Sequence, residues 1–264
     1  MVLESLLSAK VAEENPLYDF GYGVALSLVS LAAGYFLFPA ISSLLSVVLL
    51  SIGIVPVLMK IFYYEEGKRA LFETHLKALR FFLVFFLAVS LTFGTLNYFL
   101  PKLGFASVSE RLFSEEAREI SSITATFQSG QFFSGIFQNP TILTIVKNNL
   151  IVLFSSFVLA LVFGGGAAFI LVWNAAVFGI FLSIAADKGM GVLIFSLIYA
   201  LPELVSYYIG GLSGGILSAE FSSVFTKRKR KLSVALVVNS ALLILVAAVL
   251  IVLMGILEGF LISP

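Results

Sequence analysis

The chain has 264 residues, of which 60% are hydrophobic and 12% are charged, and its mean hydropathy is +1.08. Soluble domains usually contain about 25% charged residues, so this composition predicts an integral membrane protein and excludes an ordinary water-soluble fold. The net charge of +1 gives no reason to expect nucleic-acid binding. The chain contains no cysteine, which excludes disulfides, thiolate metal sites and cysteine nucleophiles within it.

Two uncharged stretches are too long for one membrane crossing each. A helix rises about 1.5 Å per residue and the hydrocarbon core is about 30 Å thick, so residues 20–59 and 148–186 must each form two spans. Phe38-Pro39 predicts the first break because the residue before a proline avoids the helical region. Gly164-Gly165-Gly166 predicts the second, because glycine accepts the backbone angles of a tight reversal. The spans expected with clear limits are 21–37, 40–62, 81–101, 191–219 and 232–257, and the stretch 148–186 supplies two more.

The segment between spans three and four is different, because charged and apolar residues alternate in it at helical spacing. This pattern predicts an amphipathic helix at the membrane interface. A short apolar piece at 131–137 is also expected to lie against the membrane, and Asn139-Pro140 predicts the start of span four. The alternating residues are Val108, Glu110, Arg111, Leu112, Phe113, Glu115, Glu116, Arg118, Glu119, Ile120 and Ile123.

The sequence therefore predicts an all-α fold, a polytopic integral membrane helix bundle with about seven transmembrane helices and additional interfacial amphipathic helices. Basic loops stay cytoplasmic, and residues 64–80 and 226–231 are both basic. This rule predicts a multi-pass cell-membrane protein with a cytoplasmic N-terminus and an extracytoplasmic C-terminus. The four expected regions are a cytoplasmic amphipathic N-terminus at 1–19, spans one to three at 20–100 with a cytoplasmic helix at 64–80, an extracytoplasmic interfacial segment at 101–146, and spans four to seven at 147–264.

Glu203 is the clearest ionisable residue within the predicted hydrocarbon zone. Spans five and six reverse near residue 188, so Asn174 is expected at the depth of Glu203, near the middle of the membrane. A buried carboxyl is normally paired, protonated or directed into a cavity. Three interpretations stay open: hydrogen bonding between helices, a site for an ion, proton or small polar solute, and a catalytic base. The predicted site consists of Glu203, Asn174, Ser155, Ser156, Tyr199 and Ser206.

Other motifs indicate helix ends, packing or lipid contact. Asn148 and Asn149 are either span-entry caps or a second polar site. The expected partners are membrane lipids, together with protein partners or a second copy of the chain. The glycines Gly210, Gly211, Gly214 and Gly215 are spaced for close helix packing. The residues expected to contact lipid head groups are Lys227, Arg228, Lys229, Arg230 and Lys231.

Catalytic patterns are weak, so the sequence predicts a protein that is not an enzyme. His75 is the only histidine, which excludes the two-histidine motif of membrane metalloproteases. Asp19 and Asp187, the only aspartates, are expected near opposite membrane faces and cannot form an aspartyl protease pair. An intramembrane hydrolase that uses Glu203 as a lone base remains as an alternative. No metal and no cofactor is expected.

Short motifs recur in a defined order along the chain. They are Asn15 to Tyr18 (Asn-Pro-Leu-Tyr), Phe38-Pro39, Pro56, Glu65-Glu66 with His75, Asn148-Asn149, Asn174, and Pro202-Glu203 followed by glycines. In this order the sequence resembles the stage II sporulation protein M family in its archaeal-type form. The resemblance implies a membrane scaffold, because bacterial members look like scaffolds that localise cell-wall remodelling enzymes. It does not name a role for a relative without such a wall.

The leading hypothesis from the sequence is a non-enzymatic membrane protein whose polar site around Glu203 serves permeation of an ion or a small polar solute. The alternative is a scaffold or assembly factor that holds partners through residues 102–146 and the helix at 64–80.

Overall fold

The computed structural model describes residues 15–66, 75–128, 140–226 and 231–262. Within these ranges the chain is helical and has no strand. The helices are α3 (Pro16–Leu37), α4 (Ser42–Glu66), α5 (Leu76–Lys102), α6 (Ala106–Gln128), α7 (Pro140–Phe163), α8 (Ala168–Lys188), α9 (Met190–Phe225) and α10 (Val234–Ile262). Short 3-10 turns precede α4 at Pro39–Ile41 and α8 at Gly165–Ala167.

Seven of these helices are long and apolar enough to cross a membrane, which confirms the predicted number of spans. They are all the helices named above except α6. Both predicted breaks are present, because α3 ends just before Phe38-Pro39 and α7 ends just before Gly164. Gly164 has a φ of +59°, which a residue with a side chain rarely adopts. A Cβ at Gly164 would also lie 2.6 Å from the Met59 sulfur, so this turn packs closely on α4.

Contacts between helix termini define two ends of the bundle. At one end the Tyr63 hydroxyl lies 3.1 Å from the Ser222 hydroxyl, which joins the last turns of α4 and α9. At the other end the Lys102 ammonium donates to the Asp187 carboxylate at 2.7 Å, which joins the last turns of α5 and α8. The C-terminal ends of α4 and α9 therefore lie at one end of the bundle and those of α5 and α8 at the other, as the predicted topology requires. Which end faces the cytoplasm stays a prediction from the basic loops.

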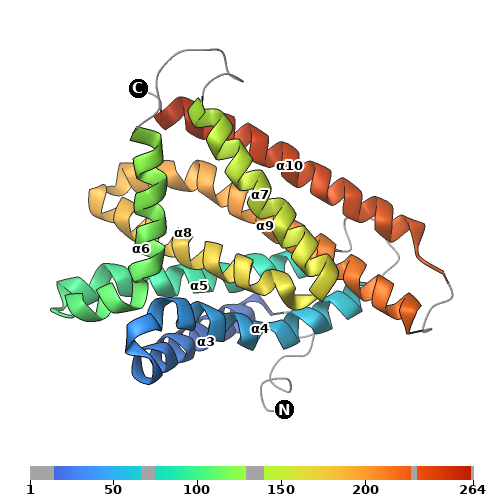
Figure 1. Ribbon diagram of the computed structural model, residues 1–264, viewed down its shortest axis with the longest axis horizontal. Coiled ribbons are helices and arrows are strands. Elements are labelled where there is room, and N and C mark those ends of the chain that lie inside the picture. Colours follow the sequence, from blue (N-terminus) through green and yellow to red (C-terminus); the bar gives the residue numbers. More distant parts are fainter. Residues whose placement is uncertain (1–14, 67–74, 129–139, 227–230, 263–264) are drawn as a thin grey trace.

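Helix α6 is kinked at Phe113, and the part after the kink runs across the ends of α5 and α8 instead of along them (Figure 1). It packs against α4, α5 and α8 through one face. Leu112 and Phe113 on that face are buried, whereas Glu110, Arg111 and Arg118 on the opposite face are exposed. This is the arrangement expected of an amphipathic helix at the membrane surface.

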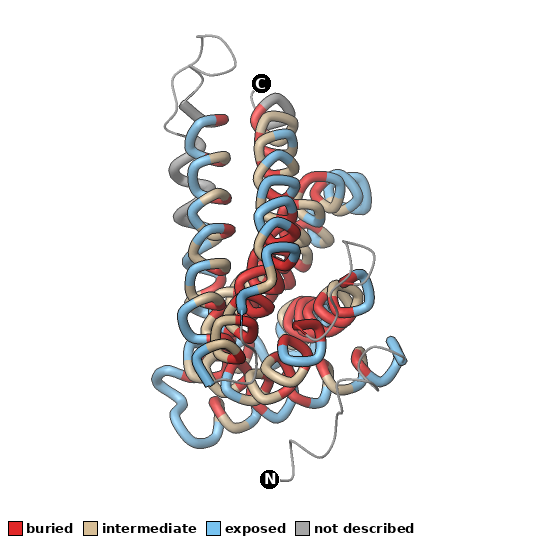
Figure 2. The backbone as a smooth tube through the Cα atoms, turned by 90° about the vertical axis from the view of Figure 1, so that its right-hand side faces the viewer, coloured by how far each residue is buried: buried red, intermediate tan, exposed pale blue. Residues whose placement is uncertain are grey.

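Helix α9 is the central helix of the bundle, in contact with α4, α5, α7, α8 and α10. Buried residues concentrate in the interior helices, and the outer faces of the bundle are exposed (Figure 2). Nearly every residue of α9 from Glu203 to Glu220 is buried. Phe62 and Tyr208 belong to an aromatic core that joins α9 to α4 and α5. The other rings of this core are Phe81, Phe82, Phe85 and Phe86.

The charged stretch 64–80 differs from the expected surface helix. Tyr64 to Glu66 continue α4, Leu76 to Arg80 begin α5, and residues 67–74 lie outside the described residues. Both transmembrane helices thus extend beyond their uncharged runs. The expected N-terminal segment up to residue 14, the apolar piece 131–137, the cap at Asn139 and basic residues 227–230 also lie outside the described residues. Lys231, which follows them, is exposed.

Candidate functional site

Glu203 lies in the middle of α9, directly after Pro202, and only 8% of its surface is exposed. The Asn149 amide of α7 hydrogen-bonds the Glu203 carboxyl, and the Glu258 carboxyl of α10 is near enough to act on it electrostatically. Among the described residues, the Oε1 oxygen of Glu203 has no hydrogen-bond partner. We call Asn149, Glu203 and Glu258 the carboxyl site.

Small residues bring the three helices of the carboxyl site together. A Cβ at Gly210 would lie 3.0 Å from the Leu153 carbonyl oxygen, so the backbones of α9 and α7 approach closely. Gly214, one turn further along α9, makes the same kind of approach to Phe157. On α10, a Cβ at Gly255 would lie 2.7 Å from a Val146 methyl group of α7. Glycine at these positions therefore lets α7 pack closely against both α9 and α10, which are also in contact with each other.

Two tyrosines of α9 border the carboxyl site. Tyr199 is hydrogen-bonded to Ser196, and the charges of Glu203 and Glu258 both act on it. The same two carboxyls act on Tyr207, which is buried. Tyr199 was part of the site predicted from the sequence, whereas Tyr207 and Glu258 were not.

The remaining residues of the predicted site are distributed over several positions. The Asn174 amide donates to the Ile170 carbonyl oxygen in its own helix at 2.8 Å. The Ser206 hydroxyl likewise donates within its own helix, to the Pro202 carbonyl oxygen at 2.9 Å. Ser156 is fully buried on α7, and its hydroxyl has no hydrogen-bond partner among the described residues. The structure thus gives Glu203 the neighbours Asn149 and Glu258, and Asn149 was expected only as a helix cap or second polar residue.

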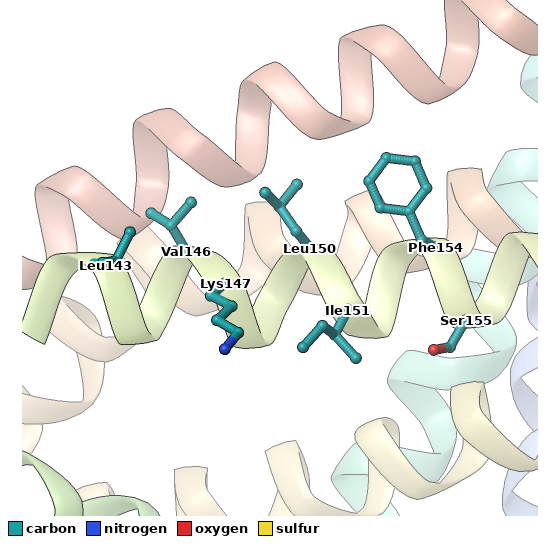
Figure 3. A pocket seen from close by; sticks show the side chains of 7 residues that line it. All are labelled: Leu143, Val146, Lys147, Leu150, Ile151, Phe154 and Ser155. Carbon is teal, nitrogen blue, oxygen red and sulfur yellow. The ribbon is translucent and has the colours of Figure 1, made fainter. Parts of the chain in front are cut away.

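Ser155 lines a groove of about 440 Å³ along α7, shown in Figure 3. Apart from Ser155 and Lys147, the groove is formed by apolar side chains. Lys147 and Ser155 lie on the opposite side of α7 from Val146 and Leu150 (Figure 3). The complete lining is Leu143, Val146, Lys147, Leu150, Ile151, Phe154 and Ser155.

A second group of buried ionisable residues lies where α3, α4 and α5 meet. Asp19 is fully buried, and the positive charge of Arg80 acts on its carboxyl. At the start of α5, the helix that contains Arg80, His75 Nδ1 lies 2.5 Å from the Glu65 carboxylate. His75 is only 3% exposed, although it lies in the charged stretch 64–80 of the sequence. Pairing with Glu65 explains how an imidazole can be buried there.

A third group of polar residues attaches α6 to the bundle. The Ser43 hydroxyl donates to the Glu116 carboxyl at 2.5 Å and accepts the Glu115 backbone N–H at 3.2 Å. One residue earlier, the Ser42 hydroxyl donates to the Arg111 carbonyl oxygen at 2.8 Å. Glu116 is fully buried, and this burial raises the pKa of its carboxyl, an effect that the Ser43 hydrogen bond partly opposes. We call the contact of Ser43 with Glu115 and Glu116 the α6 clamp.

Asn97 extends the attachment of α6 to α5 and α8. Its side-chain N–H donates to the Ser183 hydroxyl at 2.7 Å, and its side-chain oxygen accepts the Ser109 hydroxyl at 3.1 Å. One amide thereby joins three helices. Helix α6 is therefore held from both α4 and α5, which fixes its direction across the end of the bundle.

In the part of the chain that the structure describes, no three histidine, aspartate or glutamate side chains come together as ligands for a metal ion. No curated protein and no solved structure matches the chain. The stage II sporulation protein M family matches residues 78–264. This range includes α5 from its third residue, helices α6 to α10, the α6 clamp except for its Ser43, and the whole carboxyl site. On this match, the chain belongs to the stage II sporulation protein M family.

Proposed function

We propose that the protein is a membrane scaffold that holds a partner protein on the outward face of α6. The observation that carries the proposal is the α6 clamp, which fixes an amphipathic helix across one end of the bundle. A helix held only by lipid would need no buried hydrogen bonds to the transmembrane helices. Family membership supports the same function, because bacterial members resemble scaffolds for cell-wall remodelling enzymes.

The outward face of α6 has the chemistry of a surface that contacts protein in water. Glu110, Arg111 and Arg118 are exposed, and Arg118 forms a 3.1 Å ion pair with Glu115 on the same helix. Charges of both signs alternate along this face, which favours a partner with a complementary mixed surface over a purely acidic or basic one. The opposite face of α6 is used for attachment. A partner bound to the outward face would therefore be held at a fixed angle to the membrane.

Site-specific photo-crosslinking in cells tests the scaffold function. A photoreactive residue replaces Glu110 or Arg118 on α6, and a matched control replaces Lys188, which is exposed at the same end of the bundle. We expect both α6 positions to crosslink to one protein, identified by mass spectrometry, and Lys188 to give little of that product. Equal yields from all three positions, or crosslinks to lipid alone, would count against a scaffold.

Charge reversal provides the second arm of this test. Arg118→Glu should reduce the crosslink formed at Glu110, because it reverses a charge on the proposed contact surface while the hydrogen bonds of Ser43 to the Glu115 backbone and the Glu116 side chain remain available. Lys188→Glu, the matched reversal, should leave that crosslink unchanged. The clamp itself predicts that a bulky replacement of Ser43 weakens the crosslink by misplacing α6.

Permeation of an ion or small polar solute is the second candidate function, and the convergence of Asn149, Glu203 and Glu258 from three spans is the observation that favours it. It predicts flux through liposomes that contain the purified protein and loss of that flux in Glu203→Gln. Protein liposomes without flux above that of empty liposomes would exclude permeation and leave the scaffold function unaffected.

A further inference from the structure

We propose that Glu203 and Glu258, together with Asn149, bind one monovalent cation, either a proton or an alkali-metal ion, between α7, α9 and α10. The proposal concerns binding and is separate from the scaffold function. It is also separate from permeation, because a bound cation can stabilise three packed helices without crossing the membrane.

The first argument is the repulsion between the two carboxylates, which one bound cation reduces. Two carboxylates at one site inside a membrane protein repel each other, and the buried Glu203 also loses its hydration. Helices α9 and α10 contain no lysine or arginine, so neither supplies a compensating cation. On α7, Lys147 is two residues from Asn149, which places the two side chains on opposite sides of the helix. Lys147 is exposed and Asn149 is buried, in agreement with that placement.

The second argument is an unused oxygen. The Oε1 oxygen of Glu203 is buried and has no hydrogen-bond partner among the described residues, so the bond from Asn149 goes to the other oxygen. An unpartnered buried acceptor destabilises the folded state, and a proton or cation on that oxygen removes the penalty. The bordering groups on α9, Tyr199 and Tyr207, are neutral and do not replace the missing positive charge.

The chemistry of the donors limits the identity of the ligand. Carboxylate and amide oxygens are hard ligands, which suit a proton or an alkali-metal ion better than a soft transition metal. Divalent calcium usually takes six to eight oxygens, and the described residues bring no third acidic side chain to the two carboxyls. A single positive charge is therefore the ligand that fits.

Infrared difference spectroscopy of the purified, reconstituted protein tests the proton. We expect the carbonyl-stretch band of a protonated carboxyl to persist at neutral pH and to lose a component in both Glu203→Gln and Glu258→Gln. Glu116→Gln is the matched control, because it removes another buried carboxyl and should leave that component in place. A spectrum in which neither Glu203→Gln nor Glu258→Gln changes this band excludes a bound proton.

Thermal unfolding of the wild-type protein in detergent tests the alkali-metal ion. Binding to the folded state raises the unfolding temperature with a saturable dependence on ion concentration, so Na⁺ or K⁺ should stabilise the protein relative to a large organic cation at equal ionic strength. Glu258→Gln should abolish the shift, and because Glu258 is only half-buried this variant is expected to fold. Two results together overturn the proposal. They are a carboxyl band that neither Glu203→Gln nor Glu258→Gln changes, and an unfolding temperature whose dependence on Na⁺ or K⁺ is the same in Glu258→Gln as in the wild-type protein.

Discussion

Gly94 in α5 and Gly179 in α8 are in backbone contact, so close that a Cβ on Gly94 would lie 2.5 Å from the Gly179 carbonyl oxygen. A Cβ on Gly179 would overlap with the Ser90 carbonyl group. The Ser90 hydroxyl donates across the same contact to the Ala175 carbonyl oxygen at 2.8 Å. This contact sets the distance between α5 and α8 and therefore positions Asn97 and Ser183, through which α6 is attached.

Replacement of Gly179 by alanine should destabilise the protein. The new methyl group would meet backbone atoms, which cannot rotate away, and overpacking of this kind typically costs about 1–3 kcal/mol. Gly191→Ala is the matched control, because nothing lies within 4 Å of a Cβ at that position. Denaturant titration of the purified proteins in detergent measures the free energy of unfolding of each variant. Similar free energies of unfolding for the two variants would contradict the proposed backbone contact.

The α6 clamp should open as the pH rises. Burial raises the pKa of Glu116 above its ordinary value of 4.5, so the neutral acid is the form that suits the packed state. The stabilisation is complete below the unfolded-state pKa and is lost as the pH rises through the higher folded-state pKa. Because the chain lacks cysteine, spin labels on Arg118→Cys and Lys188→Cys can report the distance between α6 and α8 as a function of pH.

Glu116→Gln is the control for this pH dependence. Glutamine is neutral at every pH and keeps an oxygen for the Ser43 hydroxyl, so the distance between the labels should no longer change with pH. If Glu116→Gln shows the same pH dependence as the wild-type clamp, another group is responsible. Ser43→Ala should loosen α6 at all pH values, because it removes the partner of both Glu115 and Glu116.

The spans could be predicted from the sequence because they depend on local properties. Hydrophobicity, the thickness of the bilayer and the backbone preferences at Phe38-Pro39 and Gly164 act within a few residues. They placed the seven membrane-crossing helices close to their observed bounds. The expected helix at 64–80 differed because charged residues can continue a transmembrane helix beyond the hydrocarbon, as Glu65 and Glu66 continue α4.

The carboxyl site could be predicted only in part, because it depends on how the helices are tilted. Matching Asn174 to Glu203 by residue number assumes straight helices that stand side by side. The residues beside Glu203 come instead from α7 and α10, which run obliquely to α5 and α8 (Figure 1). Glu258 lay just beyond the predicted end of span seven at 257, and no local signal identified it as a neighbour of Glu203.

The ion pair between Lys102 and Asp187 should contribute little to stability. Both side chains are about half exposed, and exposed ion pairs are weakened by water and by salt. Lys102→Met should therefore leave the unfolding temperature unchanged at physiological salt. A clear decrease would show that this pair does more than mark the end of the bundle. Removal of one partner from a fully buried ion pair would, in contrast, be strongly destabilising, because it leaves an uncompensated buried charge.

The predicted orientation can be tested with introduced cysteines. Lys188→Cys lies at the α6 end of the bundle and Lys231→Cys at the opposite end, and both positions are exposed. A membrane-impermeant maleimide should label Lys188→Cys in intact cells and Lys231→Cys only after permeabilisation. The reverse pattern would place α6 in the cytoplasm and would exclude an extracytoplasmic partner.

Asn149 and Asn148 provide a matched pair for testing whether the carboxyl site is a cooperative unit. Asn149 is buried and donates to Glu203, whereas Asn148 beside it is exposed. Asn149→Ala leaves a buried carboxyl without its donor and should lower the free energy of unfolding by about 1–3 kcal/mol. Asn148→Ala should change it by less than about 0.5 kcal/mol. In a double-mutant cycle, Glu203→Leu should remove most of the effect of Asn149→Ala, because the leucine has no carboxyl to satisfy. Additive effects would show that the two side chains are energetically independent and that Asn149 serves only as part of the packing of α7.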